Sequence, residues 1–110
     1  MDNSDKKPQI RFKGFTHLSA DRQALGNWCV YVLECDNGSF YKGKTNNIKR
    51  RINEHINGRG AKYTKLHKPV KLVYLEYFDS ESEALQKEKF LKSGFGREQL
   101  KKYLQGGFFE

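Results

Sequence analysis

The chain has 110 residues, of which 21 are lysine or arginine and 13 are aspartate or glutamate, giving a formal net charge of +8. This length fits one compact domain, and the excess of positive charge favours nucleic acid over an acidic membrane surface as the partner. No apolar run is long enough to span a membrane, and the opening MDNSDKKPQI lacks the hydrophobic segment of a secretory signal. We therefore expect a cytoplasmic protein that binds DNA and no membrane.

The first 26 residues are polar and mixed in composition, and we predict that they form an N-terminal extension. Within it, Ser19 and Gly26 are typical of the start and end of a short helix. Residues 27–110 are predicted to form the functional domain.

A β-hairpin is predicted next, because WCVYVLEC and SFYKGK are strand-like and DNG between them is a turn signal. The loop length decides which side chains share a face of the sheet. A two-residue loop, Asn37-Gly38, would put Tyr31 and Tyr41 on opposite faces. A three-residue loop with Gly38 in the left-handed conformation shifts the register by one residue and brings the two tyrosines to one face. The residues alone leave both loops open.

The hairpin contains both cysteines of the chain, Cys29 and Cys35, on its first strand. At about 3.3 Å per residue, an extended strand keeps them too far apart for a disulfide. Free thiols in a reducing cytosol are expected. Two cysteines without a paired histidine also make a zinc site improbable.

A basic helix is predicted from about Asn47 to Ile56, with Thr45 or Asn46 as its cap. The spacing predicts an inward apolar stripe of Ile48, Ile52 and Ile56, bordered by Arg51 and His55. Lys49, Arg50 and Asn53 are expected to face solvent.

A glycine-rich basic loop follows, and Pro69 opens a strand over residues 70–78. Ser80 and Glu83 form a capping box at the start of a helix. The core-facing residues of that helix are expected to be Ala84, Leu85, Leu91 and Phe90. Gly94 and Gly96 are expected to end the helix, and REQLKKYL forms a last one. The order β-β-α-β-α-α predicts an α+β fold, a small antiparallel sheet with helices packed on it.

Several polar residues fall where a plain core would exclude them. Glu88 lies within the predicted apolar stripe of its helix, and a buried carboxylate needs a cation, a metal or a donor. The ordinary interpretation is an ion pair with Lys92, while Arg51 extends past its apolar neighbours to solvent. The tyrosines, Lys44 and His55 have equally ordinary interpretations singly. Together, a carboxylate, an arginine, phenols, a lysine and a histidine in a basic domain fit a phosphodiester-cleaving site with Mg²⁺.

The ordered set resembles the GIY-YIG nucleases. The two signature triplets correspond to Cys29-Val30-Tyr31 and Tyr41-Lys42-Gly43. Arg51 follows ten residues after Tyr41, as in the nuclease module of the bacterial excision-repair incision protein, and Glu88 ends an EAL-x-x-E motif. The resemblance covers residues 28–104, and it is greatest for the small single-domain bacterial branch. Cys29 and Lys42 depart from the signature glycine and isoleucine, and the asparagine that some members carry after the metal-binding helix is absent.

The resemblance implies a three-stranded antiparallel sheet flanked by helices, with both tyrosines in one active site and hence the bulged hairpin. One tyrosine would bind the nucleophilic water as general base or relay, and Arg51 would contact the scissile phosphate. Glu88 would bind Mg²⁺ or Mn²⁺, and Lys44 and His55 would flank the site.

The leading hypothesis is a metal-dependent DNA endonuclease acting on structured or damaged DNA. The residues expected to contact nucleic acid are Lys42, Arg50, Arg59, Lys62, Tyr63 and Lys65. The alternative is a non-catalytic nucleic-acid-binding module of the same fold, and the intact tyrosine, arginine and glutamate set favours the enzyme. A domain this small is expected to bind weakly, and the sequence leaves open whether a protein partner or a homodimer assists it.

Overall fold

The computed structural model of the chain describes residues 28–106. The predicted N-terminal extension and the helix expected near Ser19 lie outside these residues, so both stay predictions. The elements in chain order are β1 (Trp28–Cys35), β2 (Phe40–Thr45), α1 (Ile48–Ile56), α2 (Lys62–Leu66), β3 (Pro69–Phe78), α3 (Glu81–Lys92) and α4 (Gly94–Leu104). The predicted α+β class and the antiparallel sheet are confirmed.

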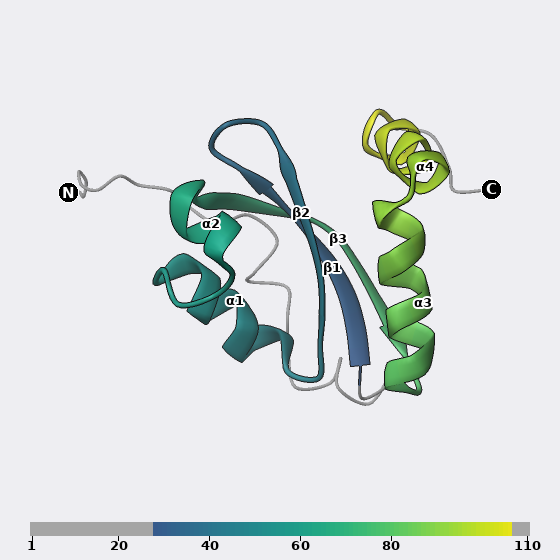
Figure 1. The fold of residues 1–110 in the computed structure, drawn as a ribbon, viewed down its shortest axis with the longest axis horizontal. Helices are drawn as coiled ribbons and strands as arrows, with labels where there is room; N and C mark the ends of the chain where they lie inside the picture. Colours follow the sequence, from purple (N-terminus) through teal and green to yellow (C-terminus); the bar gives the residue numbers. More distant parts are fainter. Residues whose placement is uncertain (1–27, 107–110) are drawn as a thin grey trace.

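The sheet is antiparallel with strand order β2-β1-β3, so β1 is its central strand. Helices α1 and α2 lie on one side of it, and α3 and α4 lie on the other (Figure 1). Nearly every residue of β1 is buried, because helices cover both of its faces. This explains why the strand reads as a continuous apolar run without alternation.

Two cores therefore share the central strand. On the α1 side, Tyr31 and Leu33 pack with Ile48 and Ile52. On the α3 side, the buried residues are Val30, Val32, Tyr74, Ala84, Leu91 and Leu100. Leu85, expected in this second core, is exposed, and Phe90 is partly buried against it. The inward stripe of α3 is thus narrower than the sequence pattern indicates.

The hairpin between β1 and β2 has the three-residue loop. Cys35 N–H donates to the Ser39 carbonyl at 2.8 Å, and Gly38 N–H donates to the Cys35 carbonyl at 2.9 Å. Gly38 has a φ of 84°, the left-handed conformation that a glycine adopts readily. The resulting register places Tyr31 opposite Gly43 and Leu33 opposite Tyr41. The bulged alternative is the correct one.

Side chains close in sequence cap the helices. Two helix ends, the start of α1 and the boundary between α3 and α4, differ from expectation. The cap of α1 is Asn47, whose side chain accepts from Arg50 N–H at 3.0 Å, while Thr45 accepts from Asn47 N–H at 3.1 Å. The boundary between α3 and α4 is Ser93 alone, and Gly94 is already helical. The Ser93 hydroxyl accepts from Gly96 N–H at 3.1 Å, so it caps α4 directly after α3 ends.

Candidate active site

Tyr31 and Tyr41 lie on the same face of the sheet, the face that α1 covers. They are diagonal neighbours on β1 and β2, and their ring centroids are 6.3 Å apart. Their exposure differs, because Tyr31 is 1% exposed whereas Tyr41 is only partly buried. The sequence prediction that the bulged hairpin pairs these two tyrosines is confirmed.

His55 of α1 lies against both tyrosines. Its Nε2 is 2.8 Å from the Tyr31 hydroxyl oxygen, and its ring centroid is 5.1 Å from that of Tyr41. The residue is 1% exposed, although the sequence analysis placed it only at the border of the stripe. Ile56, expected in the stripe, is exposed instead. The inward face of α1 runs through positions i, i+4 and i+7, and the last of these is His55.

Two glycines give these side chains room. A Cβ on Gly43 would lie 2.4 Å from the Tyr31 hydroxyl oxygen, and a Cβ on Gly60 would lie 2.3 Å from His55 Nδ1. The Tyr31 hydroxyl thus rests against the backbone of β2, and the imidazole rests against the loop before α2. Gly43, the last residue of the second triplet, is therefore required for the position of Tyr31.

We expect Gly43→Ala to lower the free energy of unfolding by about 1–3 kcal/mol, because the added methyl displaces the buried Tyr31 side chain. Gly94→Ala is the matched control, since a Cβ there meets nothing within 4 Å. Its stability should be unchanged or slightly higher, as alanine favours a helix. Urea unfolding monitored by circular dichroism measures both. Equal stabilities for the two variants would show that Tyr31 does not depend on the bare backbone at Gly43.

Arg51 lies one turn before His55 on α1. Its Nη1 is 2.8 Å from Glu54 Oε1, and the guanidinium lies near enough to the Tyr31 hydroxyl to favour its ionised form, which lowers the Tyr31 pKa against the effect of burial. The side chain is 30% exposed, so it connects the buried pair to the surface. The Glu54 hydrogen bond raises the pKa of Arg51 further above its ordinary value, and the same bond lowers the pKa of Glu54. Arg51 is therefore a permanent cation at the mouth of the site.

Burial sets the charge states of the two inner residues. Loss of solvation, reinforced by the Arg51 cation, lowers the pKa of His55 to about 4. Burial also raises the pKa of Tyr31 above its ordinary value, although the nearby Arg51 cation opposes the shift. At neutral pH the site therefore holds a neutral imidazole, a protonated Tyr31 phenol and a charged guanidinium.

The neutral imidazole makes stability depend on pH. In the unfolded chain His55 takes up a proton near its ordinary pKa of 6.5, whereas the folded protein holds it neutral down to about pH 4. Between these values the unfolded state binds more protons, so stability falls as the pH falls. The contribution reaches about 1.4 kcal/mol per pH unit. Urea titrations of the wild type and His55→Gln at pH 7 and pH 4.5 test this, and a loss equally steep in both proteins would contradict it.

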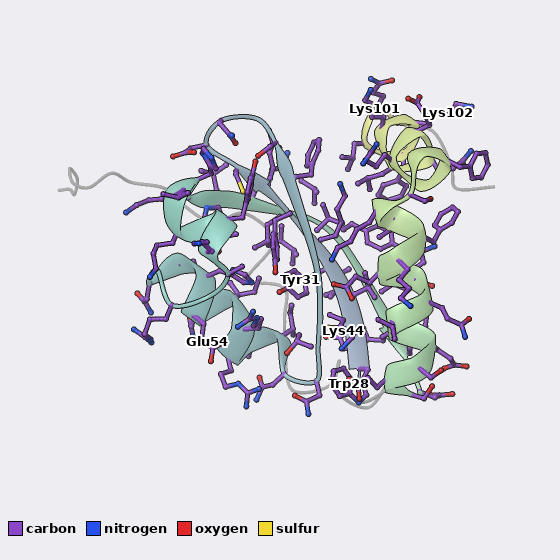
Figure 2. The ribbon with its side chains drawn as sticks, viewed as in Figure 1. Trp28, Tyr31, Lys44, Glu54, Lys101 and Lys102 are labelled. Carbon is purple, nitrogen blue, oxygen red and sulfur yellow. The ribbon has the colours of Figure 1, made fainter. Side chains whose placement is uncertain are left out.

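Lys44 and Glu88 lie on the opposite side of the sheet from the tyrosines. Lys44 is opposite Val30, and its Nζ is 3.0 Å from Glu81 Oε2 and 5.2 Å from the centroid of the Trp28 ring. Figure 2 shows Lys44 beside Trp28 at the foot of α3, with Glu54 across the sheet on α1. The resemblance implied that Lys44 flanks the active site, but the structure places it on the face of β2 opposite to Tyr31 and Tyr41. The alternation of side chains along β2 is the cause.

Glu88 belongs to α3, which packs on the Val30 and Val32 side of β1. Its side chain is only 14% exposed, and its Oε2 is 3.2 Å from Lys92 Nζ. The ion pair that the sequence offered as the ordinary interpretation is thus present. The structure brings together Tyr31, Tyr41, Arg51 and His55, and it places Glu88 beyond the sheet from them.

Strand β2 separates the tyrosine, arginine and histidine group on one face of the sheet from Glu88 and Lys44 on the other. It is an edge strand of the described sheet, and α3 packs on it as well as on β1. Lys42 lies on its α3 side, where burial lowers its pKa and the cations Arg97 and Lys92 lower it further. A cationic cluster of Lys42, Lys92 and Arg97 therefore lies beside Glu88. A ligand running along the β2 border would touch this cluster and the Arg51 side of the sheet.

Within residues 28–106, no three or more histidine, cysteine, aspartate or glutamate side chains gather into a metal-binding cluster. Both cysteines are buried free thiols, as predicted. In that same part of the chain, no helix is long and apolar enough to cross a membrane.

The basic loop contains a helix that the sequence did not predict, α2, which ends one residue before His67. Arg59, Lys62 and Lys65 are exposed along this segment. The Tyr63 hydroxyl instead donates to the Ser39 hydroxyl and ties α2 to the hairpin. Sequence reasoning also missed Thr64, which is buried and lies 2.8 Å from His55 Nδ1. The sequence AKYT gives no sign of this by itself. Thr64 can be recognised as an inward-facing residue only when α2 is known to be a helix.

The geometry of the two triplets agrees with a comparison against known protein families. Residues 27–103 match the sequence model of the GIY-YIG catalytic domain. The chain belongs to the GIY-YIG family. In this GIY-YIG domain, Tyr31 ends the first triplet and Tyr41 begins the second, and Tyr31 of the first triplet is the cross-strand partner of Gly43 of the second. The domain implies membership of an endonuclease superfamily.

Related proteins carry names that state no activity. A UPF0213 protein of Bacillus cereus is 46% identical over 79 residues, which cover 72% of this chain and 81% of the relative. A UPF0213 protein of Staphylococcus saprophyticus is 46% identical over 78 residues, covering 71% and 94%. The solution NMR structure of a UPF0213 protein from Bacillus halodurans is 44% identical, with a TM-score of 0.43, covering 66% of this chain and 80% of that one. The small single-domain branch of the GIY-YIG family, suggested by the sequence, is confirmed.

Proposed function

We propose that the protein is a divalent-metal-dependent endonuclease that hydrolyses phosphodiester bonds of structured or damaged DNA in the cytoplasm. The observation that carries the proposal is the partly exposed Arg51 guanidinium, which lies beside a buried, hydrogen-bonded Tyr31–His55 pair in a GIY-YIG domain. The planar fork of a guanidinium matches the oxygens of a phosphate. The net charge of +8 supports a polyanionic substrate.

Because the two tyrosines differ in burial, we assign them different roles. Tyr41 is the phenol that solvent can reach, so we assign to its hydroxyl the binding of the nucleophilic water. It would act as general base in its phenolate form, or as a relay that passes its own proton on as it takes the water's. Tyr31 and His55 are buried, and their rings pack against the ring of Tyr41 and hold it in place. Arg51 neutralises the negative charge that grows on the phosphate as the water attacks.

Glu88 is the residue that we assign to the metal. Its carboxylate oxygens are hard ligands, and its partner Lys92 has a side chain 55% exposed, so the ammonium can turn into solvent when a cation arrives. Mg²⁺ keeps most of its water ligands and binds substrate phosphate, so one carboxylate suits it. The metal supplies charge on the phosphate and polarises water. Lys44 remains a supporting cation on the same face of β2.

Contacts to the DNA backbone are assigned to exposed or half-exposed residues on β2, on α1 and in the segment that contains α2. They are Lys42, Arg50, Arg59, Lys62, Tyr63 and Lys65. Such contacts carry little sequence information, which fits recognition of DNA by its structure. Their contribution should weaken steeply with added salt. A second copy or another protein would enlarge this small surface.

A cleavage screen tests the proposed function. Labelled duplex, flap, four-way junction and single-stranded DNA are incubated with the protein and Mg²⁺ or Mn²⁺. We expect nicking of at least one branched or single-stranded substrate, loss of nicking with EDTA, and recovery when metal is restored. A mock purification from the same host controls for contaminating nucleases. Metal-independent nicking, or nicking by the mock sample, would contradict the proposal.

The second candidate is a non-catalytic nucleic-acid-binding module. The observation that favours it is the Glu88–Lys92 ion pair, which occupies the carboxylate proposed for the metal. In that case, gel-shift assays would detect salt-sensitive binding of the four DNA structures, and no product would form with either metal. The same screen therefore separates the two functions.

A further inference from the structure

A line of hydrogen bonds runs from α2 into the site. The Thr64 hydroxyl donates to the Ala61 carbonyl at 3.1 Å, and its oxygen lies 2.8 Å from His55 Nδ1. His55 Nε2 lies 2.8 Å from the Tyr31 hydroxyl oxygen, and the Arg51 cation is a near neighbour of that oxygen. Thr64, His55 and Tyr31 are all buried, so water does not compete for these bonds.

The protons of this line can be placed from the α2 end. A threonine hydroxyl has one proton, and Thr64 gives it to the Ala61 carbonyl. The contact with His55 therefore requires Nδ1 to carry a hydrogen and donate it to the Thr64 oxygen. In a neutral imidazole Nε2 is then an acceptor, and the Tyr31 hydroxyl must donate to it.

The same order follows from the other end. The Tyr31 hydroxyl bonds to His55 Nε2, and the Arg51 guanidinium near it has donors only, so Arg51 cannot accept the Tyr31 proton. The single Tyr31 proton is then free to go to His55 Nε2. With the other tautomer, His55 would donate through Nε2, the Tyr31 proton would face a cation, and Nδ1 would face an oxygen whose proton is already used. Only one direction satisfies every buried group in the line.

We propose that Thr64 is a positioning residue that fixes His55 as its Nδ1–H tautomer and thereby commits the Tyr31 proton to His55. The lone pairs of the Tyr31 oxygen then stay available to the neighbouring Arg51 cation, the group that we propose meets the phosphate. Gly60 serves the same arrangement, because a Cβ there would collide with His55 Nδ1. The effect on catalysis rests on the proposed endonuclease function, whereas the tautomer does not.

Nitrogen-15 NMR of the histidine rings tests the tautomer without DNA. The His55 signals are identified by their absence from the spectrum of His55→Gln. At pH 7 we expect the wild type and Thr64→Ser to show a protonated Nδ1 and a bare Nε2, since serine keeps the hydroxyl. Thr64→Val, which has the same shape without the hydroxyl, should show a mixture of tautomers or the Nε2–H form. A wild-type His55 with a protonated Nε2 would overturn the proposal, and this measurement needs no variant of Thr64 to fold.

Cleavage assays test the consequence. With a substrate from the screen, Thr64→Val should lower kcat by about 10-fold or more, as is usual when a side chain that orients a functional group is lost. Thr64→Ser should restore it, and the Kd for DNA should stay the same in both. A Thr64→Val protein with an altered tautomer and unchanged kcat would overturn the positioning role. If no protein cleaves DNA, the proposed function fails, and the NMR result still decides the tautomer.

Discussion

Glu88→Gln should abolish metal-dependent cleavage while DNA binding persists. The substitution keeps the size of the side chain and removes the negative charge, so the proposed metal ligand loses most of its affinity. A catalytic metal contributes several kcal/mol, and we therefore expect a loss of at least about 1,000-fold in kcat. Initial nicking rates at saturating Mg²⁺ measure this loss, and gel shifts in Ca²⁺ measure binding.

Glu98→Gln is the control for the charge change. Glu98 is exposed on α4, and its carboxylate is 3.9 Å from Lys101 Nζ. This variant should cleave like the wild type. A fully active Glu88→Gln protein would exclude Glu88 as the metal ligand. Because Glu88 lies across the sheet from the tyrosines, that outcome would direct the search for the ligand to the α1 side.

Arg51→Ala should reduce cleavage by about 100- to 1,000-fold, the usual cost of removing one group that stabilises transition-state charge. Arg51→Lys should recover little of this, since an ammonium cannot form the paired bonds of a guanidinium. Arg50→Ala is a close control, because Arg50 precedes Arg51 on the same helix and its side chain is 60% exposed. It should weaken DNA binding modestly and leave kcat unchanged.

The Arg51 variants also need a stability measurement. The Arg51–Glu54 ion pair is about one-third exposed, so solvent screens it and its loss should lower the stability only slightly. Urea unfolding therefore distinguishes a folded, inactive protein from an unfolded one. Equal cleavage by Arg51→Ala and Arg50→Ala would remove Arg51 from the site.

The sequence predicted the parts of the fold that local chemistry decides. Ser80 begins α3 through its own side chain, accepting from Glu83 N–H at 3.2 Å, so residues adjacent in the chain contain the whole cause. The hairpin was predicted only in part. Gly38 allows the bulged loop, but the residues alone also allowed the two-residue loop, and the family resemblance made the choice.

The parts that the sequence missed depend on contacts distant in the chain. A short amphipathic helix can direct either His55 or Ile56 inward, and the pocket formed by Tyr31 and Gly60 selects the histidine. The segment around Thr64 is too short for periodicity to reveal a helix. The placement of Lys44 was available from the alternation along β2, because a residue three positions after Tyr41 must face the other way.

The position of β1 between two cores has a consequence for the site. Tyr31 lies between Val30 and Val32, whose side chains enter the opposite core, so one stretch of backbone belongs to both halves of the domain. Local opening of the tyrosine face would have to disrupt the packing of α3 and α4 at the same time. The tyrosine face should therefore open only together with the α3 side of the domain, so its stability depends on Val30 and Val32 in the opposite core.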